Sequence, residues 1–408
     1  MDRTFVIVGA GLAGATAAEA LRARGFAGRI VLIGAENEFP YDRPPLSKDY
    51  LQGKSEKAKL YVHTQQWYAD HNVEVRVGIR ATTIKRAAHE VTLEDGERIR
   101  YDKLLLTMGA SPRRLDVPGA DLGGVLYLRN VNDSETLKSA FATADSVVIV
   151  GAGWIGMESA VAARAAGCDV TVIGTGELPL VSVLGPQVAQ HYAALHRRHG
   201  VEFRLGVAVA EITGGPGRAS GVRLADGTFL DADVVVVGIG ATPNTALAED
   251  AGLATGDGVV VDEHLATIDP DIFAAGDVAR NYYPHLALHL RVGHWSAARK
   301  QPPVAAAGMM GQAGAYDNVP YFFSDQYEMG MEYLGYVPKD TAAEVVYRGD
   351  VATGKYLVFW LESDRVLAGM NVNIWHLTGA IRALVSSGAR VDRIKLANPA
   401  IALDEVFA

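Results

Sequence analysis

The residues with the clearest chemical meaning form two copies of the pattern glycine-x-glycine-x-x-glycine, each between a short β-branched run and an alanine-rich run. Their glycines are Gly9, Gly11 and Gly14 in the first copy, and Gly151, Gly153 and Gly156 in the second. In such a loop the first glycine makes a tight turn, the second lets the backbone approach a pyrophosphate, and the third lets helix and strand pack closely. The next helix points its free N–H groups at the phosphates. The sequence therefore predicts two dinucleotide sites.

An acidic residue about twenty residues beyond such a loop is expected to bind the adenosine ribose. Glu36 fits the first loop because it follows the strand-like run 29–33. After the second strand-like run, 169–173, the expected acidic position holds Gly174, and Glu177 comes three residues later. No arginine cluster follows that would bind a 2′-phosphate, so the sequence favours NADH over NADPH.

Two dinucleotides in one chain suggest one resident electron carrier and one visiting donor, which is the usual pairing of FAD with a nicotinamide. Cys168 is the only cysteine. A dithiol relay needs two cysteines, so electrons must leave the flavin directly. We expect Cys168 itself to be a packing residue.

The elements that position these loops are two β-α-β units, which predict an α/β fold with two Rossmann-like dinucleotide-binding domains. Strand-like runs at 104–107 and 234–237 end in glycine turns that contain Gly109 and Gly240. The tail mixes strand-like runs with a helix-like run at 374–386, and we expect Pro302-Pro303 to mark a helix start. The predicted domains are a discontinuous FAD domain of 1–110 and 242–318, a nicotinamide domain of 111–241 and an α+β domain of 319–408.

Composition limits the partners. The chain has 408 residues, with 38 basic and 47 acidic side chains and a formal net charge of −9. This balance argues against a nucleic-acid binder. No apolar run reaches the roughly 18 residues of a membrane span, so no such span is expected. Nothing in the sequence demands an oxidising compartment, so we expect a cytoplasmic protein, either monomer or homodimer. His285, His289 and His294 lack acidic or cysteine partners nearby in sequence, and no metal site is expected.

Longer motifs make the chain resemble the oxygenase-coupled, FAD-dependent ferredoxin reductases, which have a glutathione-reductase-like fold. The matching stretches are 40–48 (PYDRPPLSK), 151–158 (GAGWIGME), 273–279 (FAAGDVA), 294–301 (HWSAARKQ) and 321–327 (YFFSDQY). Their order and spacing extend over nearly the whole chain. The resemblance implies hydride transfer from NADH to FAD and electron transfer to a two-iron ferredoxin, which would feed a Rieske oxygenase or a cytochrome P450.

The resemblance also implies roles for individual residues. Lys48 would lie near the flavin and Glu158 in the nicotinamide pocket, and these two are the expected catalytic residues, which could pair with each other. The residues expected to bind FAD are Gly9, Gly11, Gly14, Glu36, Arg43, Lys48, Ala81, Gly109, Asp277 and Trp295. The residues expected to bind the nicotinamide dinucleotide are Gly151, Gly153, Ile155, Gly156, Glu158 and Gly240.

The chain departs from the pattern of this family at three positions. Phe323 stands where many relatives have tryptophan, Gly293-His294 stands where several have a glutamate before the tryptophan, and Gly174 replaces an acidic residue. An acidic ferredoxin would need a basic patch on this acidic chain, for which the candidates are Arg43, Arg291, Arg299 and Lys300. Two alternatives stay open: a redox-switch flavoprotein like apoptosis-inducing factor, and an NADH oxidase.

Overall fold

The computed structural model describes residues 3–408, which form two compact units. The first unit holds the described residues up to Asp42, residues 57–111 and residues 242–322, and the second holds residues 43–56, 112–241 and 323–408. The chain passes between the units on either side of residues 43–56, within the short strands β8 (Ala110–Pro112) and β17 (Ala241–Pro243), and within β23 (Tyr321–Gln326). Among the described residues, no helix is both long and apolar enough to cross a membrane.

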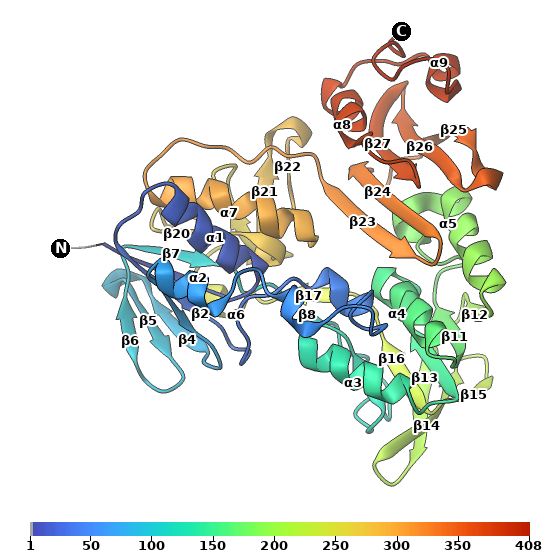
Figure 1. Cartoon of the computed structure of the whole chain (residues 1–408), viewed down its shortest axis with the longest axis horizontal. Coiled ribbons are helices and arrows are strands. Elements are labelled where there is room, and N and C mark those ends of the chain that lie inside the picture. Colours follow the sequence, from blue (N-terminus) through green and yellow to red (C-terminus); the bar gives the residue numbers. More distant parts are fainter. Residues whose placement is uncertain (1–2) are drawn as a thin grey trace. The chain divides into compact units, whose positions relative to one another are not determined.

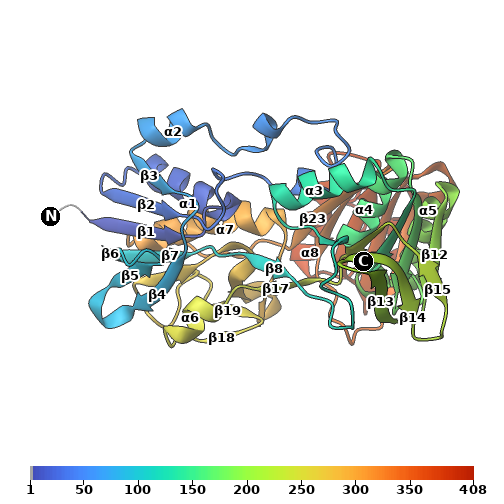
Figure 2. The same ribbon diagram turned by 90° about the horizontal axis from the view of Figure 1, so that it is seen from below.

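The first unit is built on a five-stranded parallel sheet in the order β20-β7-β1-β2-β3. Its strands are β1 (Thr4–Val8), β2 (Arg29–Ile33), β3 (Val73–Arg76), β7 (Lys103–Leu106) and β20 (Ile272–Ala274). Apart from the edge strand β3, they are short and mostly apolar runs, as expected of strands covered on both faces. Figure 2 shows β1, β2 and β3 side by side. The sheet brings the first glycine loop, at the end of β1, beside the ends of β2 and β7.

Two helices of this unit, α1 (Leu12–Ala23) and α7 (Trp295–Met309), lie next to each other although they are far apart in sequence (Figure 1). α1 is rich in alanine, and its small side chains allow close packing on the sheet and on α7. The sequence-based expectation for α7 was wrong. Pro302 and Pro303 lie inside the helix rather than at its start. Because Gln301, Pro302, Ala305 and Ala306 are buried, packing of this face outweighs the backbone hydrogen bonds that the two prolines remove.

The remaining elements of the first unit are smaller. They are the antiparallel strands β4 (Ala81–Lys85), β5 (Glu90–Leu93) and β6 (Arg98–Arg100); the sheet of β18 (Thr255–Gly256), β19 (Gly258–Val261), β21 (Ala279–Tyr283) and β22 (Leu288–Leu290); the helices α2 (Gln65–Asp70) and α6 (Ala246–Asp250); and the 3₁₀ turns η2 (Lys57–Leu60), η3 (Arg86–Ala88), η4 (Gly276–Val278) and η5 (Pro284–Leu286).

The second unit repeats the parallel-sheet design in the order β12-β11-β10-β16-β9. Its strands are β9 (Val125–Tyr127), β10 (Ser146–Val150), β11 (Asp169–Gly174), β12 (Val201–Leu205) and β16 (Val234–Val237). The helices with it are α3 (Val131–Phe141), α4 (Trp154–Ala165) and α5 (Val181–Arg198). A three-stranded antiparallel sheet adds β13 (Val209–Gly215), β14 (Arg218–Leu224) and β15 (Phe229–Asp231). The second glycine loop therefore lies at the end of β10, as the first lies at the end of β1.

The C-terminal part of the second unit is an antiparallel sheet in the order β23-β24-β27-β26-β25. Beyond β23, its elements are β24 (Met329–Gly335), β25 (Glu344–Asp350), η6 (Val351–Thr353), β26 (Lys355–Glu362), β27 (Arg365–Val372), α8 (Thr378–Ser387) and α9 (Arg393–Ala397). β26 is nearly all apolar and its interior is buried, as expected of a central strand. The predicted α/β class with a C-terminal α+β part is confirmed.

The three-domain division predicted from sequence stays a prediction. The two units differ from it because the second unit contains both the predicted nicotinamide domain and the predicted C-terminal domain, and also residues 43–56. This segment contains η1 (Pro44–Ser47) and belongs to the second unit. Two hydrogen bonds fasten it to α3: the Ser134 hydroxyl donates to the Leu46 carbonyl at 2.8 Å, and the Tyr50 hydroxyl donates to the Glu135 carboxylate at 2.8 Å.

Candidate functional site

The first glycine loop has the geometry that a bound pyrophosphate requires. A Cβ atom on Gly9 would lie 2.2 Å from the Thr107 carbonyl oxygen, and one on Gly14 would lie 2.2 Å from the Gly9 carbonyl oxygen. Gly9 also has φ +119°, which side-chain-bearing residues avoid. A Cβ on Gly11 would meet nothing within 4 Å, and Gly11 caps α1 without any side-chain hydrogen bond. The middle glycine is thus the one that faces open space, at an uncapped helix N-terminus.

The second glycine loop repeats this arrangement. A Cβ on Gly151 would lie 2.4 Å from the Gly238 carbonyl oxygen, and one on Gly156 would lie 1.9 Å from the Gly151 carbonyl oxygen. Gly153 again meets nothing within 4 Å and caps α4 without a side-chain hydrogen bond. Ile155, in the first turn of α4, is 39% exposed. The residues at both loops fit a dinucleotide phosphate, because N–H groups at a helix N-terminus bind anions.

Both loops pack against the strand ends that the sequence singled out. The hypothetical Cβ of Gly9 would lie 2.8 Å from the backbone nitrogen of Met108, just before Gly109, and that of Gly151 would lie 3.2 Å from Ile239, just before Gly240. Gly109 and Gly240 both have positive φ, at +66° and +106°. The structure therefore places Gly109 and Gly240 at the two glycine loops.

Strand register corrects the comparison of the two ribose positions. Val8 pairs with Ile33 in the first sheet and Val150 with Ile173 in the second, so Gly34 and Gly174 are equivalent. The acidic residue of the first unit, Glu36, comes two positions later and accepts a backbone hydrogen bond from Gly78. Gly176 accepts the equivalent bond from Gly206. The counterpart of Glu36 is therefore Gly176 and not Gly174, and Glu177 is one residue away instead of three.

Of the other predicted FAD residues, Asp277 lies near the first loop. The turn η4, which carries Asp277, packs on the first turn of α1, since a Cβ on Gly276 would lie 3.1 Å from the Ala13 Cβ. The buried Gln301 of α7 accepts from the Gly276 N–H at 2.7 Å and fixes this turn. Glu36 accepts from the Tyr41 hydroxyl. Ala81 begins β4 and is half-buried.

Trp295 is the first residue of α7, and its indole Nε1 donates to the Asp42 carboxylate at 2.9 Å. This bond ties the start of α7 to the residue just before Arg43. Arg43 itself belongs to the second unit, where its guanidinium donates to the Arg129 carbonyl oxygen. The structure therefore places Arg43 and Lys48 in the second unit and the other predicted FAD residues in the first.

The second unit contains a buried ion pair between the two residues predicted to be catalytic. The Lys48 Nζ lies 2.8 Å from the Glu158 Oε1, with side-chain exposures of 15% and 4%. The hydroxyls of Ser47 and Ser324 also donate to Glu158, Ser324 at 2.7 Å. The predicted pairing of Lys48 with Glu158 is confirmed. A charge this deeply buried needs such partners, because its desolvation is costly.

Local sequence explains how Lys48 reaches this position. Pro44 and Pro45 begin η1 and fix φ near the value that a helical turn needs, so the short turn ends at Lys48 in a defined orientation. Lys48 Nζ also lies 5.5 Å from the centre of the Phe323 ring. An aromatic ring is therefore retained at the position where Phe323 departs from the family pattern.

Sequence analysis missed four residues around this pair: Ser47, Ser324, Gln326 and His196. The first three stand inside quoted motifs, but no role was assigned to them. Ser324 and Gln326 are two apart in β23, and alternate strand residues face the same side. Their spacing of two residues was therefore the sequence feature that could have indicated a shared role for Ser324 and Gln326. Between them, burial raises the pKa of Asp325, while Lys48 opposes the rise.

The proposed docking cations are not equivalent. Arg291 is 16% exposed and pairs with Asp257 at 3.0 Å. Arg299 is exposed on α7, with its guanidinium 5.7 Å from the centre of the Trp295 ring, and Lys300 is half-buried over Tyr321. Arg299 and Lys300 remain the better candidates for an acidic partner.

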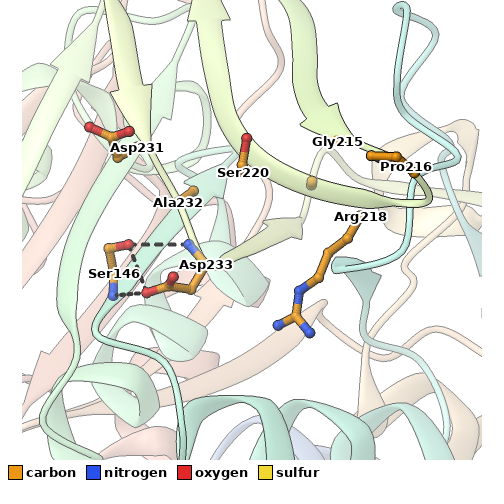
Figure 3. A pocket seen from close by; sticks show the side chains of 9 residues that line it. Ser146, Gly215, Pro216, Arg218, Ser220, Asp231, Ala232 and Asp233 are labelled. Atoms are coloured by element: carbon orange, nitrogen blue, oxygen red, sulfur yellow. Dashed lines mark hydrogen bonds between the residues drawn. The ribbon is translucent and has the colours of Figure 1, made fainter.

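A cavity of about 450 Å³ beside β13 and β14 lies in the second unit (Figure 3). Within it, the Asp233 carboxylate accepts from the backbone N–H and hydroxyl of Ser146, at 2.9 and 3.0 Å. Hydrogen bonds, first of all from Ser146, lower the pKa of Asp233. The lining residues include none of the predicted site residues, and Asp233 acts here as a structural link to the start of β10.

The histidines considered for metal binding have other neighbours. His285 hydrogen-bonds to Asp317, and the His294 ring stacks on Phe322 at 4.7 Å between centres. His289 lies 5.2 Å from Tyr282 by the same measure. Within residues 3–408, no group of three or more potential metal ligands occurs.

The two βαβ units with their glycine loops, and the added antiparallel sheet, define a class of two-dinucleotide oxidoreductases. The chain belongs to the pyridine nucleotide-disulphide oxidoreductase family, whose model matches residues 3–302, and a reductase C-terminal domain matches residues 321–407. The family's disulphide chemistry has no counterpart here, because Cys168 is the only cysteine and is buried.

Similar proteins indicate which kind of oxidoreductase within this family the chain resembles. The ferredoxin–NAD(+) reductase component of the anthranilate 1,2-dioxygenase system of Burkholderia cepacia is 41% identical, with 98% of each chain covered. Putidaredoxin reductase of Pseudomonas putida is 36% identical, with 99% of this chain and 96% of that protein covered. The crystal structure of a covalent putidaredoxin reductase–putidaredoxin complex matches with a TM-score of 0.94, at 35% identity and 99% and 97% coverage. The resemblance to ferredoxin reductases is confirmed.

Proposed function

We propose that this chain is an FAD-containing, NADH-dependent ferredoxin reductase that feeds electrons to an oxygenase system, and that it works in the cytoplasm. The observation that carries the proposal is the repeated glycine loop. In both units, only the middle one of the three loop glycines faces open space. FAD, when bound, accepts a hydride and can release electrons one at a time, which suits a donor of two electrons and an acceptor of one.

The residues present would hold the two dinucleotides as follows. The Gly9–Gly14 loop and the start of α1 would bind the FAD pyrophosphate, with Glu36 on its ribose, and the Gly151–Gly156 loop would bind NADH. Lys48 would stabilise negative charge that develops on the flavin, because a fixed ammonium in a dry site acts strongly on developing charge. Glu158 would favour the positive charge that develops on the nicotinamide as it loses hydride.

A steady-state assay separates this function from its alternatives. If the chain is a ferredoxin reductase, NADH consumption in the presence of a two-iron ferredoxin is expected to rise with ferredoxin concentration and to be matched by ferredoxin reduction. An NADH oxidase would consume NADH and oxygen at a rate that ferredoxin does not change. A redox switch would consume little NADH in either case and would change its oligomeric state on reduction. Either of these two results would overturn the proposal.

The nicotinamide preference is assigned to Glu177. Glu177 lies one residue beyond the counterpart of Glu36 and is exposed, so its carboxylate is available to bind a ribose. Glu177→Ala is expected to raise KM for NADH about tenfold and to leave KM for NADPH nearly unchanged, because a lost charge-assisted hydrogen bond costs about one to two powers of ten. Steady-state kinetics with both donors test this. Glu211→Ala, at a half-buried glutamate of β13 that pairs with Arg223 at 2.7 Å, is the control. If the ratio of the two KM values is unchanged in Glu177→Ala, Glu177 does not bind the ribose of the nicotinamide dinucleotide.

Docking of an acidic ferredoxin is assigned to Arg299 and Lys300. Replacing both with glutamine is expected to lower the second-order rate of ferredoxin reduction about tenfold at low salt and to flatten its dependence on ionic strength. Stopped-flow mixing of reduced enzyme with ferredoxin at several salt concentrations measures both effects. The control replaces the exposed Arg98 and Arg100 of β6 with glutamine, which changes the net charge equally. If both double variants show the same salt dependence, the effect belongs to net charge and not to this patch.

A further inference from the structure

A chain of polar side chains leads from Glu158 into the interior of the second unit. The Ser324 hydroxyl lies 2.7 Å from the Glu158 Oε1, the Gln326 Nε2 lies 3.1 Å from the Ser324 Oγ, and the Gln326 Oε1 lies 2.8 Å from the His196 Nε2. Ser324, Gln326 and His196 are at most 1% exposed. Burying polar groups without hydrogen-bond partners is costly, so these side chains form a network in which each depends on the hydrogen bonds of its neighbours.

The direction of every hydrogen bond in this chain follows from the carboxylate. An ionised carboxylate only accepts, so Ser324 must donate to Glu158. The Ser324 oxygen then accepts from the Gln326 amide nitrogen, which turns the Gln326 carbonyl oxygen towards His196. That oxygen can only accept, and His196 must therefore carry its proton on Nε2.

The surroundings of His196 support the same tautomer. Its Nδ1 finds no hydrogen-bond partner among residues 3–408. A buried N–H without an acceptor would be costly, and placing the proton on Nε2 leaves only a lone pair at Nδ1. Burial lowers the pKa of His196 to about 4; the hydrogen bond that His196 donates to Gln326 opposes this shift, and nearby His199 reinforces it. His196 is therefore neutral near pH 7 and acts as a fixed donor.

We propose that Ser324, Gln326 and His196 are positioning residues that orient the Glu158 carboxylate beside Lys48 for hydride transfer from NADH. The proposal rests on the proposed function, in which Glu158 faces the nicotinamide. Three aligned donor groups point their positive ends along the chain towards Glu158, and aligned hydrogen bonds strengthen one another. The C-terminal sheet, through β23, thus contributes two residues that act on the nicotinamide half of the protein.

The first test reads the histidine directly and does not depend on turnover. Heteronuclear NMR of histidine-labelled protein, with His196 assigned by its loss in His196→Gln, is expected to show the Nε2–H tautomer. Ser324→Ala frees the Gln326 amide to reverse, so the His196 signal is expected to become a mixture of tautomers, whereas Ser324→Thr keeps the hydroxyl and the single tautomer. A proton on Nδ1 in the unaltered protein would overturn the proposal, whether or not NADH reduces the flavin.

The second test measures flavin reduction by stopped flow. Ser324→Ala and Gln326→Met are expected to lower the limiting rate about tenfold while the Kd for NADH changes less than about threefold, because the loss falls on the transition state. Ser324→Thr and His196→Gln, which retain a donor, should recover most of the rate. Cys168→Ala, another buried substitution in this unit, controls for lost packing. Equal rates in Ser324→Ala and Cys168→Ala would overturn the positioning role. Failure of NADH to reduce the unaltered protein would instead refute the proposed function and leave the tautomer result standing.

Discussion

Lys48→Met is expected to lower the rate of flavin reduction by NADH at least about hundredfold. The substitution removes the ammonium that lies 2.8 Å from Glu158 and leaves a carboxylate with 4% exposure without its counterion. It should also lower the free energy of unfolding by about 3–5 kcal/mol, the usual cost of breaking one half of a buried pair. Stopped-flow reduction and urea unfolding of the FAD-loaded protein measure the two effects.

A double variant separates the loss of charge from the loss of stability. Lys48→Met combined with Glu158→Gln removes both charges, so stability should return while the reduction rate stays low. Lys103→Met is the matched control, because Lys103 pairs with Asp271 at 2.6 Å in a more exposed setting where an ion pair contributes little. Reduction of the Lys48→Met flavin at the unaltered rate would show that Lys48 is structural only.

Substitution of the middle glycines is expected to separate the two dinucleotide sites. Gly11 and Gly153 have extended backbones, at φ −96° and −87°, which valine adopts without strain, and a Cβ at either meets no protein atom within 4 Å. Gly11→Val should therefore fold but lose FAD and purify colourless. Gly153→Val should stay yellow but bind NADH at least about hundredfold more weakly, because the side chain occupies the path of the phosphates.

Absorbance spectra and NADH titrations of the two variants test this division. Gly215→Val is the control, since Gly215 in β13 also meets nothing within 4 Å and lies in neither loop. Yellow Gly11→Val protein, or Gly153→Val with unchanged NADH affinity, would contradict the assignment of that loop.

The features that sequence predicted well are local ones. Each glycine loop is recognisable with its strand and helix within a few residues, and the positive φ at Gly9 and Gly151 is one that glycine adopts readily. The pairing of Lys48 with Glu158 was also predicted from the sequence. That prediction came from two motifs, and the family resemblance supplied their roles. Fold class and family were therefore predictable from the printed sequence.

The features that sequence missed depend on contacts between distant segments. Nothing near His196 indicates that it meets Gln326, because the two belong to α5 and β23. The helix through Pro302 and Pro303 follows from packing of α7, which outweighs local propensity. The equivalence of Glu36 with Gly176 required the strand register, since counting residues from the loops placed the acidic position at Gly174.

The most direct test of the central claim is an anaerobic double-mixing experiment on the purified flavoprotein. NADH is mixed first and flavin bleaching is followed, with NADPH in a parallel series, and a two-iron ferredoxin is added in the second mix. For an NADH-dependent ferredoxin reductase we expect fast bleaching by NADH, slower bleaching by NADPH, and rapid return of the flavin colour as the ferredoxin is reduced. Fast bleaching by NADH without any transfer to ferredoxin would contradict the proposed function.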